Sequence, residues 1–261
     1  MTRRALPLLL LLLAAPLAAR AVPPDLAAFA FHQHPGAQLP LDARFTDEHG
    51  AAVRLGALLG GGPAILVLGY FHCPNLCGVV REDLFSALDR SGLNTPGDYS
   101  LIALSIDPNE TSADAASAKA SDVARYPTPG ADRGWHFMIG SAAAIAKVAG
   151  AVGFNDSFDA KLKQFIHPTG LVFVTGTGHV SGYLLGVGYQ PGDVNAAVLR
   201  ARSGGIARAA LPVLLLCFHF DPTTGRYTLA ILRILGIGAA LFALTLGGLI
   251  AFAFASGRGR A

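Results

Sequence analysis

Short apolar runs separated by turn-forming residues divide the middle of the chain into alternating strands and helices. The run 64–70 is continuous and follows a Gly-Gly-Gly-Pro segment, a pattern typical of a strand buried on both faces. Residues 99–106 alternate and are rich in β-branched and aliphatic side chains, which predicts a second strand. The same criteria predict strands at 135–139, 171–175 and 179–184, and helices at 74–90, 111–125, 141–152 and 191–201.

The order of these elements predicts an α/β domain. Strands that alternate with helices, followed by a hairpin around residues 176–178 and a last helix, are typical of a central sheet covered by helices on both faces. Two cysteines, Cys73 and Cys77, directly follow the first buried strand. A dithiol at a strand-to-helix junction in this order is the thioredoxin arrangement. We therefore expect a thioredoxin-like domain over residues 40–202, after an irregular lead-in at 22–39.

The N-terminal end predicts export. Residues 1–21 have a basic start, a short Leu/Ala core and an Ala-x-Ala ending, which is the pattern of a signal peptide cleaved before Val22. The alternative is an uncleaved anchor, but the apolar core is short for a membrane span.

The C-terminal end predicts a membrane anchor. Residues 234–255 are apolar and uncharged over the ~20 residues that a helix needs to cross a bilayer. Because Arg258 and Arg260 follow this segment, the positive-inside rule predicts a cytoplasmic tail at 256–261. We therefore expect a single-pass protein of the inner membrane, anchored in its lipid bilayer. Its main domain would face the periplasm, joined to the anchor by a linker and juxtamembrane segment at 203–233.

Charge excludes a nucleic-acid-binding role. Of the 20 Lys and Arg residues, three lie in the leader and three in or beside the anchor. The exported part therefore has fourteen basic residues and 17 Asp and Glu residues. That part carries a net charge of about −3, and its basic residues neither cluster nor interleave with aromatic residues. Three cysteines are too few for a disulfide-scaffolded exported domain, so we expect the thiols to take part in chemistry.

Cys73 and Cys77 stand at positions i and i+4 at the start of a predicted helix. Such positions share one helix face, so the two sulfurs would converge on one point. Pro74 suits the first helical position and disfavours helical angles at Cys73, which places Cys73 at the N-cap and Cys77 in the next turn. The helix dipole favours thiolates there. The pair could bind a thiophilic metal or oxidise to a disulfide, whereas the alternative is two buried small side chains.

A nitrogen ligand would complete a three-coordinate site, and eight histidines are available. His167 precedes the predicted hairpin, and in the thioredoxin arrangement the loop before that hairpin packs beside the dithiol. Its position alone does not decide between two roles: a third metal ligand, or a loop histidine whose hydrogen bonds are satisfied within the protein. Of the other histidines, His72 is expected to point away from Cys73, His136 to be structural, His49 and His179 to be solvated, and His32 and His34 to be a possible chelating pair.

Five segments carry a family resemblance: Phe71 to Gly78, Ser105 to Thr111, Gly134 to Phe137, His167 to Phe173 and Gly182 to Gly186. Together they resemble the SCO/SenC family of copper chaperones. The resemblance covers about residues 40–201, and its most specific feature is the spaced dithiol with a distant histidine. It implies a thioredoxin-like domain that binds copper through Cys73, Cys77 and His167 and is not an enzyme. It further implies that the domain helps to assemble the binuclear copper centre of cytochrome c oxidase subunit II, with a copper donor protein or a thiol reductase as a second partner.

The chain departs from the family in two ways. Better-known members are anchored at the N-terminus, whereas this chain is expected to be anchored at its C-terminal end. Many members also have an acid beside the ligand histidine, whereas here Phe165 and Ile166 precede His167, and the nearest acids are Asp156 and Asp159. Metal-bound imidazole usually needs a hydrogen-bond acceptor on its other nitrogen, so the orientation of His167 is an open question.

Two further interpretations remain. The chain could be a thiol-disulfide oxidoreductase that reduces the cysteines of an exported partner, with Cys73 attacking and Cys77 resolving; this activity would not need His167. Near the anchor, Cys217 and His219 could form an auxiliary metal site, although an apolar juxtamembrane segment explains them more simply.

Overall fold

The computed structural model describes residues 31–72, 77–161 and 163–209, together with 238, 241–242 and 244–248 near the C-terminal end. The predicted signal peptide, Cys73, Cys217 and His219 lie outside the described residues, as does the side chain of Cys77. Among the described residues, no helix is both long enough and apolar enough to cross a membrane. Most of the segment 234–255 lies outside them, so the C-terminal anchor stays a prediction.

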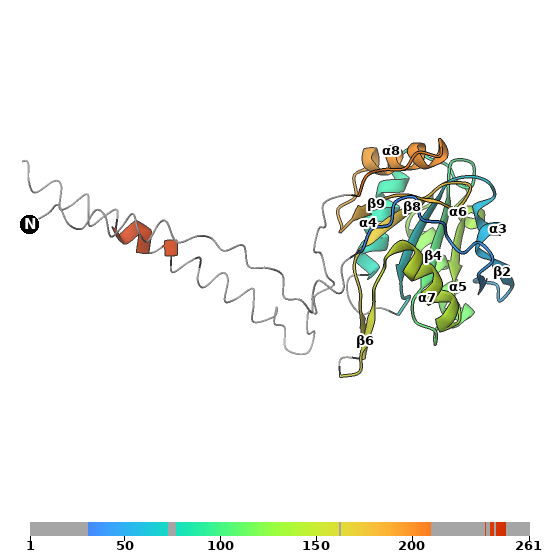
Figure 1. Cartoon of the computed structure of the whole chain (residues 1–261), viewed down its shortest axis with the longest axis horizontal. Helices are drawn as coiled ribbons and strands as arrows, with labels where there is room; N and C mark the ends of the chain where they lie inside the picture. The colour runs from blue at the N-terminus through green and yellow to red at the C-terminus, as the bar shows by residue number, and fades with distance from the viewer. Residues whose placement is uncertain are drawn as a thin grey trace, which may run out of the picture.

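A five-stranded mixed sheet forms the centre of the domain (Figure 1). Its strands are β3 (Ala64–Gly69), β4 (Ser100–Ser105), β5 (Trp135–Met138), β8 (Gly170–Val174) and β9 (Val180–Leu185). They lie side by side in the order β5-β4-β3-β8-β9. β3, β4 and β5 run parallel, whereas β8 is antiparallel to β3 and forms a hairpin with β9. All five strands match those predicted from the sequence, and this topology is thioredoxin-like.

Helices cover both faces of the sheet, as the apolar strands require. They are α3 (Leu55–Leu59), α4 (Cys77–Asp89), α5 (Ser112–Arg125), α6 (Ala131–Gly134), α7 (Ala142–Val152) and α8 (Pro191–Arg202). One core lies under α3 and α7, and the other lies under α4 and α8, with buried residues of α5 and α6 at its edge. β3 contributes Leu66 and Leu68 to the first core and Ile65 and Val67 to the second. The two-residue period of a strand thus explains why its sequence is continuously apolar.

Polar residues start the helices where the sequence predicted. The Thr111 side chain accepts a hydrogen bond from the Asp114 N–H, and the Asp114 carboxylate accepts one from the Thr111 N–H, which together form a capping box at α5. Ser141 caps α7 by accepting from the Ala144 N–H. The predicted helix start at Pro74 lies outside the described residues, and α4 is described from Cys77 onward.

Two short hairpins were not predicted. One pairs β1 (Arg44–Thr46) with β2 (Ala52–Arg54), and the other pairs β6 (Ser157–Asp159) with β7 (Gln164–Ile166). Each strand has three residues, which is too short to show a period in the sequence. The β6–β7 hairpin extends away from the body of the domain (Figure 1) and leads directly into His167.

Candidate metal centre

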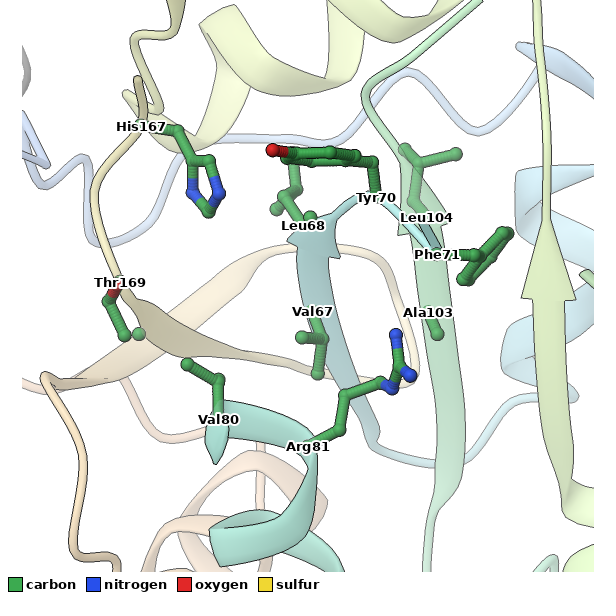
Figure 2. Close-up of a pocket in the computed structure, with 12 residues that line it drawn as sticks. Val67, Leu68, Tyr70, Phe71, Val80, Arg81, Ala103, Leu104, His167 and Thr169 are labelled. Carbon is green, nitrogen blue, oxygen red and sulfur yellow. The ribbon is translucent and has the colours of Figure 1, made fainter. Parts of the chain in front are cut away.

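His167 lies in the loop between β7 and β8, beside the C-terminal end of β3. Leu171 pairs with Val67 across the antiparallel β3–β8 ladder, so the residues before β8 come next to those that follow β3. His167 and Thr169 line a small cavity together with residues 67–71, Val80 and Arg81 of α4, and two residues of β4 (Figure 2). The loop therefore lies beside residues 67–71, which lead toward Cys73. That it packs beside the dithiol itself stays a prediction, because Cys73 and the side chain of Cys77 lie outside the described residues.

Aromatic side chains hold the imidazole of His167. The residue is only 3% exposed. Its ring stacks on Phe154, with centroids 5.7 Å apart, and meets Tyr70 in an edge-on contact at 6.1 Å. In Figure 2 the imidazole points from the loop toward Tyr70. The ring plane is therefore fixed by packing within the core rather than left to a flexible loop.

One contact indicates which nitrogen of a neutral His167 ring carries the hydrogen. Nδ1 lies 2.9 Å from the carbonyl oxygen of Pro168. Because a carbonyl oxygen can only accept, Nδ1 donates its proton, and in the neutral ring Nε2 then carries the lone pair. A ring held in this tautomer presents Nε2 as the nitrogen that can ligate a metal.

The carboxyl group of Asp156 lies near enough to His167 for the two to interact electrostatically. Burial raises the pKa of Asp156 above its usual range, and the nearby His167 opposes that rise. The β6–β7 hairpin accounts for this proximity, since the chain leaves at Asp156 and returns at His167. Asp156 is one of the two acids nearest to His167 in the sequence, which has no acid directly beside this histidine.

The segment that leads from β3 to Cys73 is anchored by Glu110. The main-chain N–H of His72 donates to Oε1 of Glu110 at 2.7 Å. The His72 imidazole, which is 68% exposed, lies 3.3 Å from the same carboxylate oxygen and 3.5 Å from Oδ1 of Asp114. Sequence reasoning missed both acids. The signal was available, because parallel strands such as β3 and β4 present their carboxyl ends at one edge of the sheet.

Arg81 brings a positive charge to the wall of the cavity. It stands at i+4 from Cys77 in α4, and its Nε lies 3.0 Å from Oδ2 of Asp122 in α5. Figure 2 shows its guanidinium beside Ala103 and Phe71. Burial raises the pKa of Asp122, although the Arg81 charge acts in the opposite direction.

The other predicted roles of histidines can be compared with the structure. His136 is half-buried in β5, and burial lowers its pKa, in keeping with a structural residue. His49, His32 and His34 are exposed. Within the described ranges, no group of three or more His, Cys, Asp or Glu could hold a metal ion. The structure gives the position of the His167 ring but of neither thiol, so Cys73, Cys77 and His167 all remain predicted ligands.

Comparison with solved structures decides the type of fold. The chain is similar to a protein from Aquifex aeolicus VF5 named as a candidate electron transfer protein, with 26% identity and a TM-score of 0.56 over 66% of this chain and 96% of that one. It is similar to Arabidopsis thaliana ScoI with copper bound (17% identity, TM-score 0.51, 65% and 98% covered). It is also similar to a SCO1/SenC family lipoprotein from Bacillus anthracis str. Ames (16%, 0.52, 64% and 96%).

The domain has the SCO/SenC fold. The resemblance seen in the sequence is confirmed at this level, and the solved domains from Arabidopsis thaliana and Bacillus anthracis are both matched over nearly their whole length. No protein-family model and no curated protein sequence matches the chain.

Proposed function

We propose that the chain is a membrane-anchored copper chaperone. It binds copper through Cys73, Cys77 and His167 and delivers the ion to the copper centre of cytochrome c oxidase subunit II. The observation that carries this proposal is the placement of His167, which is buried beside the segment leading to the dithiol and has Nε2 as its lone-pair nitrogen. The copper bound in Arabidopsis ScoI, which shares the fold, supports copper as the ion.

The donor set suits a cargo that must be both held and released. Two thiolates and one imidazole favour copper over hard cations such as Mg²⁺ and Ca²⁺. A thiolate of the acceptor can join the ion before a ligand of this chain leaves, so copper passes between proteins without release to solvent. The chain turns over no substrate and is not an enzyme in this role. A copper donor protein or a thiol reductase prepares the site on the periplasmic face of the inner membrane.

Copper titration of the full chain, purified in detergent, tests this proposal. We expect about one copper per chain in the wild type, and a marked loss of affinity in Cys73→Ser, Cys77→Ser and His167→Ala. His49→Ala is the matched control, because His49 is exposed and lies outside the cavity lining. Unchanged stoichiometry and affinity in Cys73→Ser or His167→Ala would overturn the assignment.

A thiol-disulfide oxidoreductase is the second candidate, favoured by the thioredoxin-like sheet with a dithiol after its β3 strand. Thiol exchange needs Cys73 and Cys77 but not His167. The two functions can be distinguished in a strain that lacks this protein and is supplied with each variant in turn. Cytochrome c oxidase activity is then measured with and without added copper. If His167→Ala restores activity as well as the wild type while both cysteine variants fail, the oxidoreductase is the correct function.

A further inference from the structure

We propose that Glu110 is a positioning residue for the dithiol, because it clamps the main chain immediately before Cys73. This inference rests on the proposed copper-binding function. Glu110 is 8% exposed, and its two carboxylate oxygens have separate partners. Oε1 accepts the His72 N–H at 2.7 Å, and Oε2 accepts the Ser105 hydroxyl at 2.5 Å.

The clamp continues the pairing of two strands beyond their ends. Gly69 and Ser105 are the last residues of β3 and β4 and lie opposite each other in the parallel ladder. The next residue, Ile106, donates its N–H to the Gly69 carbonyl at 2.8 Å. Glu110 then bridges Ser105 to His72, so the chain leaving β3 is tied to β4 at a second point after the regular ladder has ended.

Glu110 is itself held firmly. Oδ1 of Asp107 accepts the Asn109 N–H at 2.9 Å, and the Glu110 N–H donates to the Asp107 carbonyl at 3.2 Å. The next residue, Thr111, caps α5. A turn closed on one side and a capped helix on the other leave the Glu110 backbone little freedom, so its carboxylate is a fixed point of the scaffold.

Covalent geometry transmits this constraint to the dithiol. Consecutive Cα atoms are about 3.8 Å apart across a trans peptide, so a fixed main chain at His72 confines the start of the next residue. Ligands must be held to within about 0.5 Å of productive geometry, and loss of a residue that orients a metal ligand typically costs about 10–100-fold in affinity. The main-chain contact, rather than the contact with the exposed His72 ring, therefore carries the effect, since exposed side-chain pairs of this kind contribute little.

Four variants of the full chain separate the two contacts. Glu110→Ala removes the clamp. Glu110→Gln retains it, because the amide oxygen can accept the His72 N–H while the amide nitrogen donates to the Ser105 oxygen. His72→Ala removes the imidazole but keeps the main-chain N–H. Glu110→Asp keeps the charge on a shorter side chain that cannot span both partners, and it carries the test if Glu110→Ala does not fold.

The measurement is Cu(I) affinity by competition with a colorimetric chelator, with the electron paramagnetic resonance spectrum of the Cu(II) form as a second readout. We expect Glu110→Ala and Glu110→Asp to bind copper about tenfold or more weakly with an altered spectrum. Glu110→Gln and His72→Ala should stay within about twofold of the wild type, the range of ordinary surface substitutions.

Wild-type affinity and spectrum in both Glu110→Ala and Glu110→Asp would overturn the inference. So would a loss in His72→Ala equal to that in Glu110→Ala, because the side-chain pair would then be responsible. A wild-type chain that binds no copper would instead overturn the proposed function, so the two failures are distinguishable.

Discussion

The imidazole of His167 stacks on the phenyl ring of Phe154, with ring centroids 5.7 Å apart and an angle of 29° between the planes. Phe154 is 2% exposed and also meets Phe31 edge-on at 5.4 Å. The ring of the proposed ligand is thereby continuous with the core under α7. Core packing therefore helps to orient the His167 ring, as a hydrogen-bonded neighbour usually does for a metal-bound imidazole.

Phe154→Leu should therefore weaken copper binding more than its effect on folding would suggest. We expect a loss of about 1 kcal/mol in the free energy of unfolding, as for a tolerated core replacement, and about a tenfold loss of Cu(I) affinity. Urea unfolding and chelator competition measure the two. Phe158→Leu is the control, since Phe158 is 53% exposed on the hairpin and should change neither quantity. An unchanged affinity in Phe154→Leu would show that the stacking serves core packing alone.

A buried ion pair joins the β1–β2 hairpin to the rest of the domain. The carboxylate of Glu48 is hydrogen-bonded to Lys119 of α5 and accepts the Phe137 N–H at 3.1 Å; the two charged side chains are 5% and 12% exposed. Lys119→Met leaves that carboxylate buried without its cation, so we expect a loss of about 3 kcal/mol in the free energy of unfolding at pH 7. Urea unfolding measures this loss.

The matched control for Lys119→Met is Arg133→Met, because Arg133 and its partner Asp132 are both exposed. This variant should stay within about 0.5 kcal/mol of the wild type. The double variant Glu48→Gln/Lys119→Met should recover part of the stability lost in Lys119→Met. Equal losses of unfolding free energy in Lys119→Met and Arg133→Met would contradict the claim that the cost arises from the buried Glu48 carboxylate.

Acid should weaken the domain through Glu48. Burial alone would raise the pKa of Glu48, but hydrogen bonds from Lys119 and from the Phe137 N–H outweigh it and hold the pKa below the usual 4.5. The unfolded state then binds the proton more readily, so this contribution is present above pH 4.5 and is lost as the pH falls through the folded-state pKa. Urea unfolding between pH 6 and pH 3 should show this loss in the wild type. Glu48→Gln should lack that part of the pH dependence, and an identical slope in both would refute the role of Glu48.

His136 should add a second, milder acid sensitivity. Burial lowers its pKa below 6.5; among weaker effects, Glu48 and Asp47 oppose this shift and Lys119 adds to it. The unfolded chain takes up the proton first, so stability is full above pH 6.5 and declines as the pH falls toward the folded-state pKa. His136→Gln should flatten the stability curve in this window, as measured by thermal unfolding at closely spaced pH values. If the stability curve of His136→Gln has the same shape as that of the wild type, the pH dependence in this window arises from other groups.

The strands of the sheet could be predicted because they depend on local patterns, whereas the position of His167 was expected only from the thioredoxin arrangement of the elements. The apolar run of β3 and the capping residue Thr111 are visible without any neighbour. The contacts of Asp156 and Glu110 were not predictable in the same way. Asp156 reaches His167 through a hairpin of two three-residue strands, and Glu110 reaches His72 only because β3 and β4 are neighbours in the sheet. Such contacts depend on topology, which local periodicity does not encode.

Copper K-edge X-ray absorption of the full chain loaded with one equivalent of Cu(I) tests the proposed site most directly. We expect a first coordination shell of two sulfurs and one nitrogen in the wild type, with the nitrogen lost in His167→Ala and one sulfur lost in Cys77→Ser. A wild-type shell without nitrogen, or a spectrum of His167→Ala identical to that of the wild type, would contradict copper binding by Cys73, Cys77 and His167.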